Sequence, residues 1–354
     1  MFQQLKVELL LKKREEKMKF KIKFIISILF LSIAFFPAFV NAENVQKDKA
    51  STKELGFTVQ AVLPENQIDH SSSFFDLLLD SMEQTVEVEV ISTRKEPVTV
   101  TIGVSNAGTS NAGEIVYTDT EKTKDKTLVE PVTDLVTSDQ KEIQIENYET
   151  KKCSFKIKPP QQKINGARIG ALSFMSKISE SDQQVQSVYG YRIGMILLEE
   201  DTFYKDGNAL NLQQVRPNII NGRKVIEAQL QNPQPKILEP LTVETVLKKK
   251  GEDKVLKHEK VSNMRMAPNS HFSFLTNWGL DKFKKGTYVL SIRASSSENK
   301  WAWEKEFSIN ADQAQKLEKN AAYKITYPKW VIYAAIAMVI LTLGLFSYLL
   351  FRRN

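Results

Sequence analysis

Hydrophobic and polar residues alternate with a period of two along much of residues 56–310. Valines alternate with glutamates over 86–90, aliphatic residues alternate with polar ones over 98–104, and similar patterns occur at 155–157 and 243–247. Such alternation is typical of strands with one buried and one solvent-facing side. Turn-forming residues separate the runs at 95–97, 106–108, 165–166, 206–208, 232–233 and 285–286. Because one sandwich holds about 100 residues, the pattern predicts an all-β fold of two tandem immunoglobulin-like antiparallel β-sandwiches.

The boundary between the two predicted sandwiches falls within 178–200. An apolar run, 188–198, is followed by three acidic residues, and it can either close the first domain or open the second. We place the first domain at 56–187 and the second at 188–310. The apolar segment 71–80 fits either a helical piece or a loop packed under the first sandwich.

The segments that flank the two sandwiches differ from them in composition. Residues 43–55 are polar and predict a disordered linker. Residues 311–329 predict a stalk that leads toward the C-terminus. A short helix is expected over 311–322, because that stretch lacks turn residues and is rich in Ala, Gln, Lys and Glu.

The N-terminus has the pattern of a secretory signal peptide, which we assign to residues 1–42. A basic stretch is followed by the apolar run 24–36, and the small residues of 40–42 suit cleavage before Glu43. The alternative is an uncleaved anchor, but 13 apolar residues are too few to cross a hydrocarbon core of about 30 Å. Translation can begin at Met1 or at Met18, since the signal needs nothing before Met18.

The C-terminus has the pattern of a single transmembrane helix, predicted over 330–351. Residues 331–351 carry no charge and are numerous enough to span a bilayer. Aromatic residues near its ends favour the interface, and two arginines follow as a stop signal. The predicted anchor residues are Trp330, Tyr333, Arg352 and Arg353. The prediction is an exported single-pass protein with an extracellular body and a short cytoplasmic tail, 352–354.

The net charge of +7, from 49 Lys+Arg and 42 Asp+Glu, lies at the two ends of the chain. Residues 1–42 hold eight basic and three acidic residues, and Arg352 and Arg353 add two more charges. The exported body is neutral but divided, with 16 basic and 23 acidic residues in 43–187 and 19 basic and 14 acidic residues in 188–310. The basicity therefore gives no reason to expect a nucleic-acid partner.

Side chains that could carry catalysis are scarce. The one cysteine, Cys153, excludes an intramolecular disulfide in an exported chain and lies in an alternating stretch, which predicts a buried strand thiol. The histidines, His70, His258 and His271, lack metal-ligand spacing. We therefore expect neither a cofactor nor an enzymatic activity. The alternative, a wall-modifying enzyme, would depend on Cys153 or His70.

Two glycine pairs stand out in apolar, strand-like stretches. They are Gly166 with Gly170 and Gly190 with Gly194. Close packing of backbones is the simplest account of glycine in such a position.

Two segments are candidates for ligand contact. In the polar run 64–70, Asn66, Gln67 and Asp69 are suited to hydrogen bonding with sugar or peptide groups, although the run also fits an ordinary turn. Near the end of the second domain, Trp301 and Trp303 share one face of a predicted strand. That alternation favours packing in the core over an exposed aromatic patch.

Several separated motifs resemble the WxL-interacting proteins, which are surface proteins of Gram-positive bacteria. They are GFTVQAVLPENQIDHSSSFFDLLLDSMEQTVEVEV (56–90), INGARIGALSF (164–174), VYGYRIGMILLEE (188–200), NGRKVIEAQLQNPQPKIL (221–238) and MRMAPNSHFSF (264–274). One departure is Asp80-Ser81-Met82-Glu83, where a Pro/Gly-type turn is expected. The resemblance implies a peptidoglycan-binding first domain, a host-binding second domain and WxL-domain partners. It supplies no binding residue.

The leading hypothesis is a non-enzymatic, membrane-anchored surface protein. Its first domain would bind peptidoglycan, and its second would bind host extracellular-matrix protein, WxL-domain surface proteins or both. The alternative is a structural assembly subunit that docks WxL proteins without binding wall or host directly.

Overall fold

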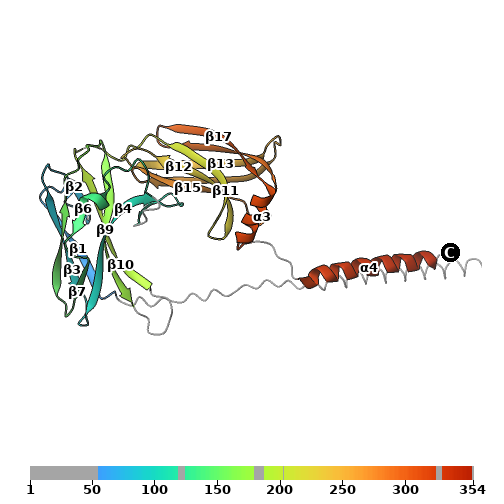
Figure 1. Ribbon diagram of the computed structural model, residues 1–354, viewed down its shortest axis with the longest axis horizontal. Helices are drawn as coiled ribbons and strands as arrows, with labels where there is room; N and C mark the ends of the chain where they lie inside the picture. The colour runs from blue at the N-terminus through green and yellow to red at the C-terminus, as the bar shows by residue number, and fades with distance from the viewer. Residues whose placement is uncertain (1–54, 119–123, 179–186, 202, 324–328, 353–354) are drawn as a thin grey trace, which may run out of the picture. The chain divides into compact units, whose positions relative to one another are not determined.

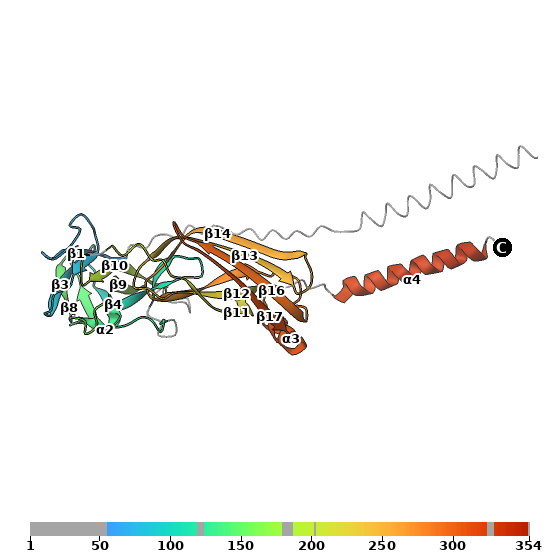
Figure 2. The same cartoon turned by 90° about the horizontal axis from the view of Figure 1, so that it is seen from above.

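The structure, a computed structural model, describes residues 55–118, 124–178, 187–201, 203–323 and 329–352. The predicted signal peptide, almost all of the predicted linker 43–55, and Arg353 lie outside these residues. Figures 1 and 2 show the described elements from two directions.

The first sheet of the first sandwich has the strand order β1-β3-β8-β6, and all of its pairs are antiparallel. Its valines at 86, 88 and 90 are buried while the intervening glutamates are not, as the alternation predicts. The strands are β1 (Phe57–Val62), β3 (Gln84–Ser92), β6 (Val136–Ser138) and β8 (Thr150–Ile157).

The second sheet has the order β2-β10-β9-β4-β5, and β7 also pairs with β4. Its strands are β2 (Phe75–Leu78), β4 (Val98–Thr109), β5 (Ile115–Thr118), β7 (Glu142–Ile145), β9 (Ala167–Ile178) and β10 (Ser187–Leu198). The segment 71–80, whose sequence fits either a helix or a loop, contains β2, a strand that is parallel to β10. A short helix, α2 (Val132–Leu135), lies near β4 and β9.

Strand β10 belongs to the first sandwich. It pairs with β9 along its whole length, from Ser187 opposite Ile178 to Leu198 opposite Ala167. Two of its side chains, Met195 and Leu197, are fully buried in the first core. This corrects our placement of 188–198 in the second domain. The pairing partner decides which core a strand joins, and the acidic residues that follow the strand do not.

The second sandwich packs a three-stranded sheet, β11-β12-β15, against a four-stranded sheet, β14-β13-β16-β17. All of their pairs are antiparallel. The strands are β11 (Asn211–Ile220), β12 (Arg223–Asn232), β13 (Leu238–Lys249), β14 (Val255–Met266), β15 (Ser270–Asn277), β16 (Gly286–Ser295) and β17 (Lys300–Ile309).

Two helices follow the second sandwich. The first, α3 (Ala311–Asn320), begins with Asn310, whose side chain accepts a hydrogen bond from the Gln313 amide. It packs on the sandwich through the buried Ala314, so this part of the predicted stalk is attached to the body. The second is α4 (Lys329–Phe351). The members of all three buried clusters lie between Leu55 and Leu317, so we expect residues 55–323, called the body below, to fold without α4.

Gly166 and Gly170 allow close contacts between backbones, as their places in strand-like stretches predict. A Cβ atom on Gly170 would lie 2.4 Å from the carbonyl oxygen of Ser105. Gly166 has a positive φ of 152°, and a Cβ there would lie 2.0 Å from the carbonyl oxygen of Pro235 in the second sandwich. Gly194 differs, because its nearest neighbours are 3.6 Å away, which is ordinary contact.

We expect Gly170→Ala to lower the free energy of unfolding of the body by about 1–3 kcal/mol. The added methyl group would meet the Ser105 carbonyl and, at 2.8 Å, the Cβ atom of Val132, which are both held in the interior. Urea unfolding would measure the change. The control is Gly108→Ala, because no atom lies within 4 Å of a Cβ at that position in β4. Equal effects of the two substitutions would contradict the packing argument.

Candidate functional site

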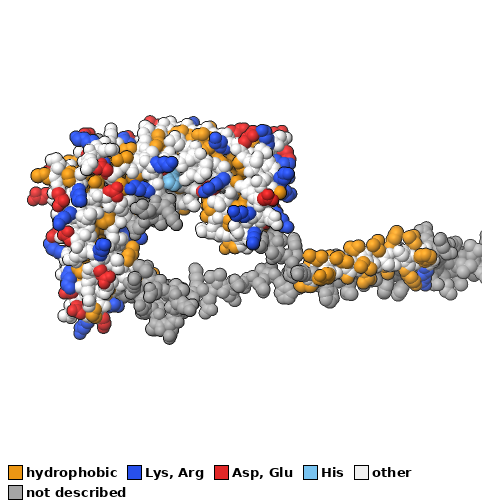
Figure 3. Space-filling model, in the orientation of Figure 1, with side chains coloured by type: hydrophobic (Ala, Val, Ile, Leu, Met, Phe, Trp, Pro, Cys, Tyr) orange, Lys and Arg blue, Asp and Glu red, His pale blue; other side chains and the backbone are white. Residues whose placement is uncertain are grey.

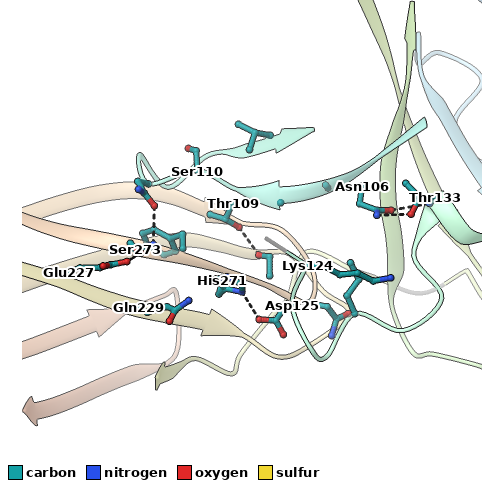
Figure 4. Close-up of a pocket in the computed structure, with 18 of the residues that line it drawn as sticks. Asn106, Thr109, Ser110, Lys124, Asp125, Thr133, Glu227, Gln229, His271 and Ser273 are labelled. Atoms are coloured by element: carbon teal, nitrogen blue, oxygen red, sulfur yellow. Dashed lines mark hydrogen bonds and ion pairs between the residues drawn. The ribbon is translucent and has the colours of Figure 1, made fainter. Parts of the chain in front are cut away.

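A cavity of about 690 Å³ opens between the β4–β5 hairpin of the first sandwich and strands β12 and β15 of the second (Figure 4). We call it the junction cleft. Its lining is rich in amide, hydroxyl and charged side chains, with few apolar ones. The polar lining residues are Asn106, Thr109, Ser110, Asn111, Lys124, Asp125, Thr133, Arg216, Glu227, Gln229, Asn269, Ser270, His271 and Ser273.

Asp125 is the centre of a hydrogen-bond network in the cleft. Its carboxylate, from the first sandwich, lies 2.8 Å from Nδ1 of His271 and 2.8 Å from Nε2 of Gln231, both in the second sandwich. The backbone amide and the hydroxyl of Thr127 also donate to it, at 2.9 and 2.8 Å. Because an ionised carboxylate only accepts hydrogen bonds, Nδ1 of His271 carries the proton.

The network also fixes the ionisation of Asp125. Its side chain is buried, with only 4% of the residue exposed, and burial by itself opposes ionisation. Hydrogen bonds from His271, Thr127 and Gln231 outweigh burial and lower the pKa of Asp125 to about 2. The carboxylate is therefore charged at neutral pH and links the two sandwiches.

Further contacts hold the two sandwiches together around the cleft. The hydroxyls of Thr109 and Ser270 lie 2.6 Å apart, and the amide of Ser273 donates to the side-chain oxygen of Asn111 at 3.0 Å. The Arg265 amide donates to the Gly113 carbonyl at 2.7 Å. A small apolar cluster with members from both sandwiches lies at the same junction; its buried members are Ala107, Ala167, Ile169, Leu198, Ile237 and Ala267.

A second carboxylate, Glu227, lies in the wall of the cleft. Burial raises its pKa, but hydrogen bonds from Arg216, Ser273 and Asn218 outweigh burial and lower the pKa overall. The Arg216 Nε atom donates to the Glu227 carboxylate at 2.9 Å, and the Arg216 side chain is half exposed. The cleft thus offers a paired ion, amides and hydroxyls, which suit hydrogen bonding to a polar ligand.

Three observations on the described residues bear on catalysis. Within the part of the chain that the structure describes, the hydrogen bonds of the His271 ring include none to a nucleophilic side chain. Across the same residues, no group of three His, Cys, Asp or Glu side chains is placed to hold a metal ion. Cys153 is buried in β8, as predicted, and burial raises the pKa of its thiol to about 11, which makes it a poor nucleophile at neutral pH.

The three residues predicted in the run 64–70 help to close their own loop. The Gln67 side chain is buried and donates to the carbonyls of Asp69 and Phe74, at 3.1 and 3.0 Å. Asn66 donates to the Leu78 carbonyl at 2.8 Å. The exposed Asp69 accepts from the hydroxyl and amide of Ser71, and these bonds lower its pKa. These contacts agree with the turn interpretation, and ligand binding by these three residues stays a prediction.

The predicted aromatic and anchor residues occupy different environments. Trp301 and Trp303 are half-buried and pack against the second core, as the alternation favoured. Trp330 and Tyr333 are exposed on α4, and Arg352 is exposed just after it. The segment Trp330–Phe351 has a mean hydropathy of 2.3 and is not buried by any part of the structure, so its length and composition allow it to cross a membrane.

The residues of the junction cleft are not predicted by any pattern in the sequence. Asp125 and His271 are 146 residues apart, and no local spacing connects them. The one available signal was the motif 264–274, which carried part of the family resemblance and contains Asn269, Ser270 and His271. On the first sandwich, the stretch around Asp125 has no comparable signal.

The fold and the cleft define a protein built from two β-sandwiches with a polar cleft at their junction. Residues 57–176 match the family model of the WxL Interacting Protein, peptidoglycan binding domain. Residues 180–319 match the model of the WxL Interacting Protein, host binding domain. The chain therefore belongs to the WxL-interacting protein family, whose two domains are binding domains.

No curated protein matches the chain. Similar solved structures include the CupB2 chaperone of Pseudomonas aeruginosa, at 10% identity over 63% of this chain and 91% of that one, with a TM-score of 0.26. The Escherichia coli chaperone DraB is similar at 10% identity over 72% and 98%, with a TM-score of 0.26. TM-scores of this size support no inference about this chain.

We expect the free energy of unfolding to depend on pH through Asp125. Its pKa is about 2 in the folded protein against an ordinary value of 3.8, so its contribution is fully present above about pH 4 and is lost as the pH falls toward 2. The shift corresponds to about 2 kcal/mol. Urea unfolding of the body and of Asp125→Asn should therefore differ by about that amount at pH 7 and converge as the pH falls below about 4. A gap that stays constant with pH would contradict this prediction.

Proposed function

We propose that this protein is a non-enzymatic surface protein that α4 anchors in the cytoplasmic membrane of a Gram-positive bacterium. Its first sandwich would bind peptidoglycan. Its second would bind a host extracellular-matrix protein, a WxL-domain surface protein or both. The observation that carries the proposal is the match of residues 57–176 and 180–319, in order, to the peptidoglycan-binding and host-binding domains of one family.

The physical properties of the described residues support these roles. The junction cleft offers amides, hydroxyls and paired charges to a polar ligand without a catalytic group beside them. An anchor in the membrane together with a wall-binding domain would hold the protein at two points. Each weak contact then gains from the effective concentration that the other provides.

Sedimentation of the body with insoluble peptidoglycan tests the first part of the proposal. We expect the body to be retained and to be released by soluble muropeptides. The body joins an acidic first sandwich to a basic second one, so the matched control is an unrelated protein of two β-sandwiches with similar net charges. Retention no greater than that of the control would refute peptidoglycan binding.

Parallel assays with purified partners distinguish binding of host or WxL proteins by the second sandwich from the alternative role as an assembly subunit. The body is incubated with immobilised matrix proteins and with a WxL-domain protein. Capture by the WxL protein alone, without retention by wall or matrix, would replace the proposal with that of an assembly subunit.

A further inference from the structure

One end of the second sandwich carries a concentration of exposed lysines. They lie at the end of β13 and in the turn to β14, residues 249–254, and in the segment 281–285 before β16. Figure 3 shows several of the blue Lys and Arg side chains of the second sandwich in one view. The six exposed lysines are Lys249, Lys250, Lys254, Lys282, Lys284 and Lys285, against the four acids Glu252, Asp253, Asp281 and Glu306. We call this surface the lysine end.

The lysine end is also the end at which the chain leaves the sandwich. The Lys250 amide donates to the Thr287 carbonyl at 2.9 Å, which joins the two lysine segments. The Phe283 amide donates to the Glu318 carboxylate of α3 at 2.9 Å. The β11–β12 turn and the end of α3 meet there too, because the Ala322 amide donates to the Gly222 carbonyl at 3.0 Å.

Much of the positive charge at this end is not neutralised locally. Lys249 pairs with Glu252 at 2.6 Å and Lys250 pairs with Glu306 at 2.8 Å, all on exposed side chains. The other four exposed lysines, Lys254, Lys282, Lys284 and Lys285, have no ion-pair partner among the described residues. Together they present a surface that favours an anionic partner.

Exposed apolar side chains accompany the lysines. Leu280 is 52% exposed, Tyr323 is 53% exposed, and Val255 is 49% exposed. Leu280 adjoins the segment 281–285, and Val255 follows the β13–β14 turn directly. Lysines beside exposed apolar and tyrosine side chains are the combination that binds an anionic membrane surface, where the apolar groups enter the interface and the ammonium groups meet phosphates.

The length of chain between the body and α4 keeps this end near the helix. Only residues 324–328 separate Tyr323 from the start of α4 at Lys329. At no more than about 3.3–3.6 Å per residue, Tyr323, where the chain leaves this end of the sandwich, stays within about 20 Å of that start. If α4 spans a bilayer, its start lies at the outer headgroup region, and the lysine end is the part of the body tethered closest to it.

We propose that the lysine end rests on the phosphate headgroups of the anionic membrane in which α4 is embedded. The inference depends on the proposed anchoring role of α4. It adds a second attachment, which would direct the opposite end of the second sandwich, and with it the junction cleft, away from the bilayer. The occupant is the lipid surface itself.

The test uses the body, which lacks α4, so that lipid binding by the lysine end is measured separately from membrane insertion of the helix. Vesicles of phosphatidylglycerol with phosphatidylcholine are compared with vesicles of phosphatidylcholine alone by sedimentation at low and high salt. We expect binding to the anionic vesicles only, weakened by salt. Changing Lys254, Lys282, Lys284 and Lys285 together to Gln should weaken this binding by at least about 10-fold.

Two further variants give the test its controls. Changing Lys95, Lys141, Lys158 and Lys163 together to Gln removes the same charge from exposed positions of the first sandwich and should leave vesicle binding nearly unchanged. Leu280→Ser keeps every lysine and should weaken binding to a smaller degree. Equal losses in the two lysine variants, or no binding of the body to anionic vesicles, would overturn the proposal.

Two further experiments distinguish membrane binding by the lysine end from binding to a phosphate polymer and from anchoring by α4. Binding to a soluble polyphosphate polymer without binding to vesicles would overturn it and indicate a phosphate-polymer partner. Carbonate extraction of membranes that contain the full chain tests α4 alone. Extraction of the full chain would refute the proposed anchor. Binding of the body to vesicles tests separately whether the lysine end binds an anionic membrane.

Discussion

Arg168→Ala should lower the free energy of unfolding of the body by about 3–5 kcal/mol, because it leaves a buried carboxylate without its partner. Arg168 lies in β9 and is only 2% exposed. One of its guanidinium nitrogens contacts Glu199, which is itself largely buried. The other donates to the Gln162 carbonyl at 2.7 Å and lies 3.6 Å from Glu130.

Urea unfolding at pH 7 would measure this loss. The matched control is Arg192→Ala, since Arg192 is exposed on the neighbouring strand β10. The double variant Arg168→Met with Glu199→Leu should recover part of the stability, because it removes both buried charges. An effect of Arg168→Ala no larger than that of the control would show that the pair does not stabilise the first sandwich.

Lys224→Met should cost about 3 kcal/mol and should loosen α3, because one buried ammonium group joins three elements. Lys224 lies in β12 and is 1% exposed. Its Nζ atom lies 2.8 Å from the Glu318 carboxylate of α3 and donates to the carbonyls of Leu280 and Asp281, at 3.1 and 2.8 Å. The cost is at the lower end for a buried pair, because Glu318 keeps some contact with solvent.

Two measurements apply to this variant. Unfolding in urea measures the change in stability. Hydrogen exchange measures the local effect, and the α3 amides should exchange faster than in the unmodified body. Lys316→Met is the control, because Lys316 is exposed on the same helix. If the α3 amides of Lys224→Met exchange as slowly as those of the control, Lys224 does not hold the helix.

The sequence predicted the class of fold because period-two alternation is a local property. Val86, Val88 and Val90 show it, and their burial follows from the pleat of a strand with one wet face. Strand β10 could not be assigned to a sandwich in the same way. Its neighbours β9 and β2 decide that assignment, and β2 is only four residues long and pairs in parallel, so it leaves almost no periodic signal.

The candidate site was harder to predict, since it is assembled from distant segments. Asp125, Gln231 and His271 meet only when the two sandwiches are in contact. The burial of Arg168 and Lys224 could not be predicted from the sequence, for a related reason. Charged residues in strands usually face solvent, and only the structure shows that these two are buried beside carboxylates from other elements.

The burial of Cys153 makes this protein unusually convenient for site-specific labelling. The chain has one cysteine, and its thiol is buried with a raised pKa, so the native protein should react slowly with maleimide reagents. A cysteine introduced at an exposed position, such as Lys284→Cys or Tyr189→Cys, would then be the preferred site for a spin label or fluorophore. Depth-dependent quenchers in a membrane could report each position without removal of the native thiol.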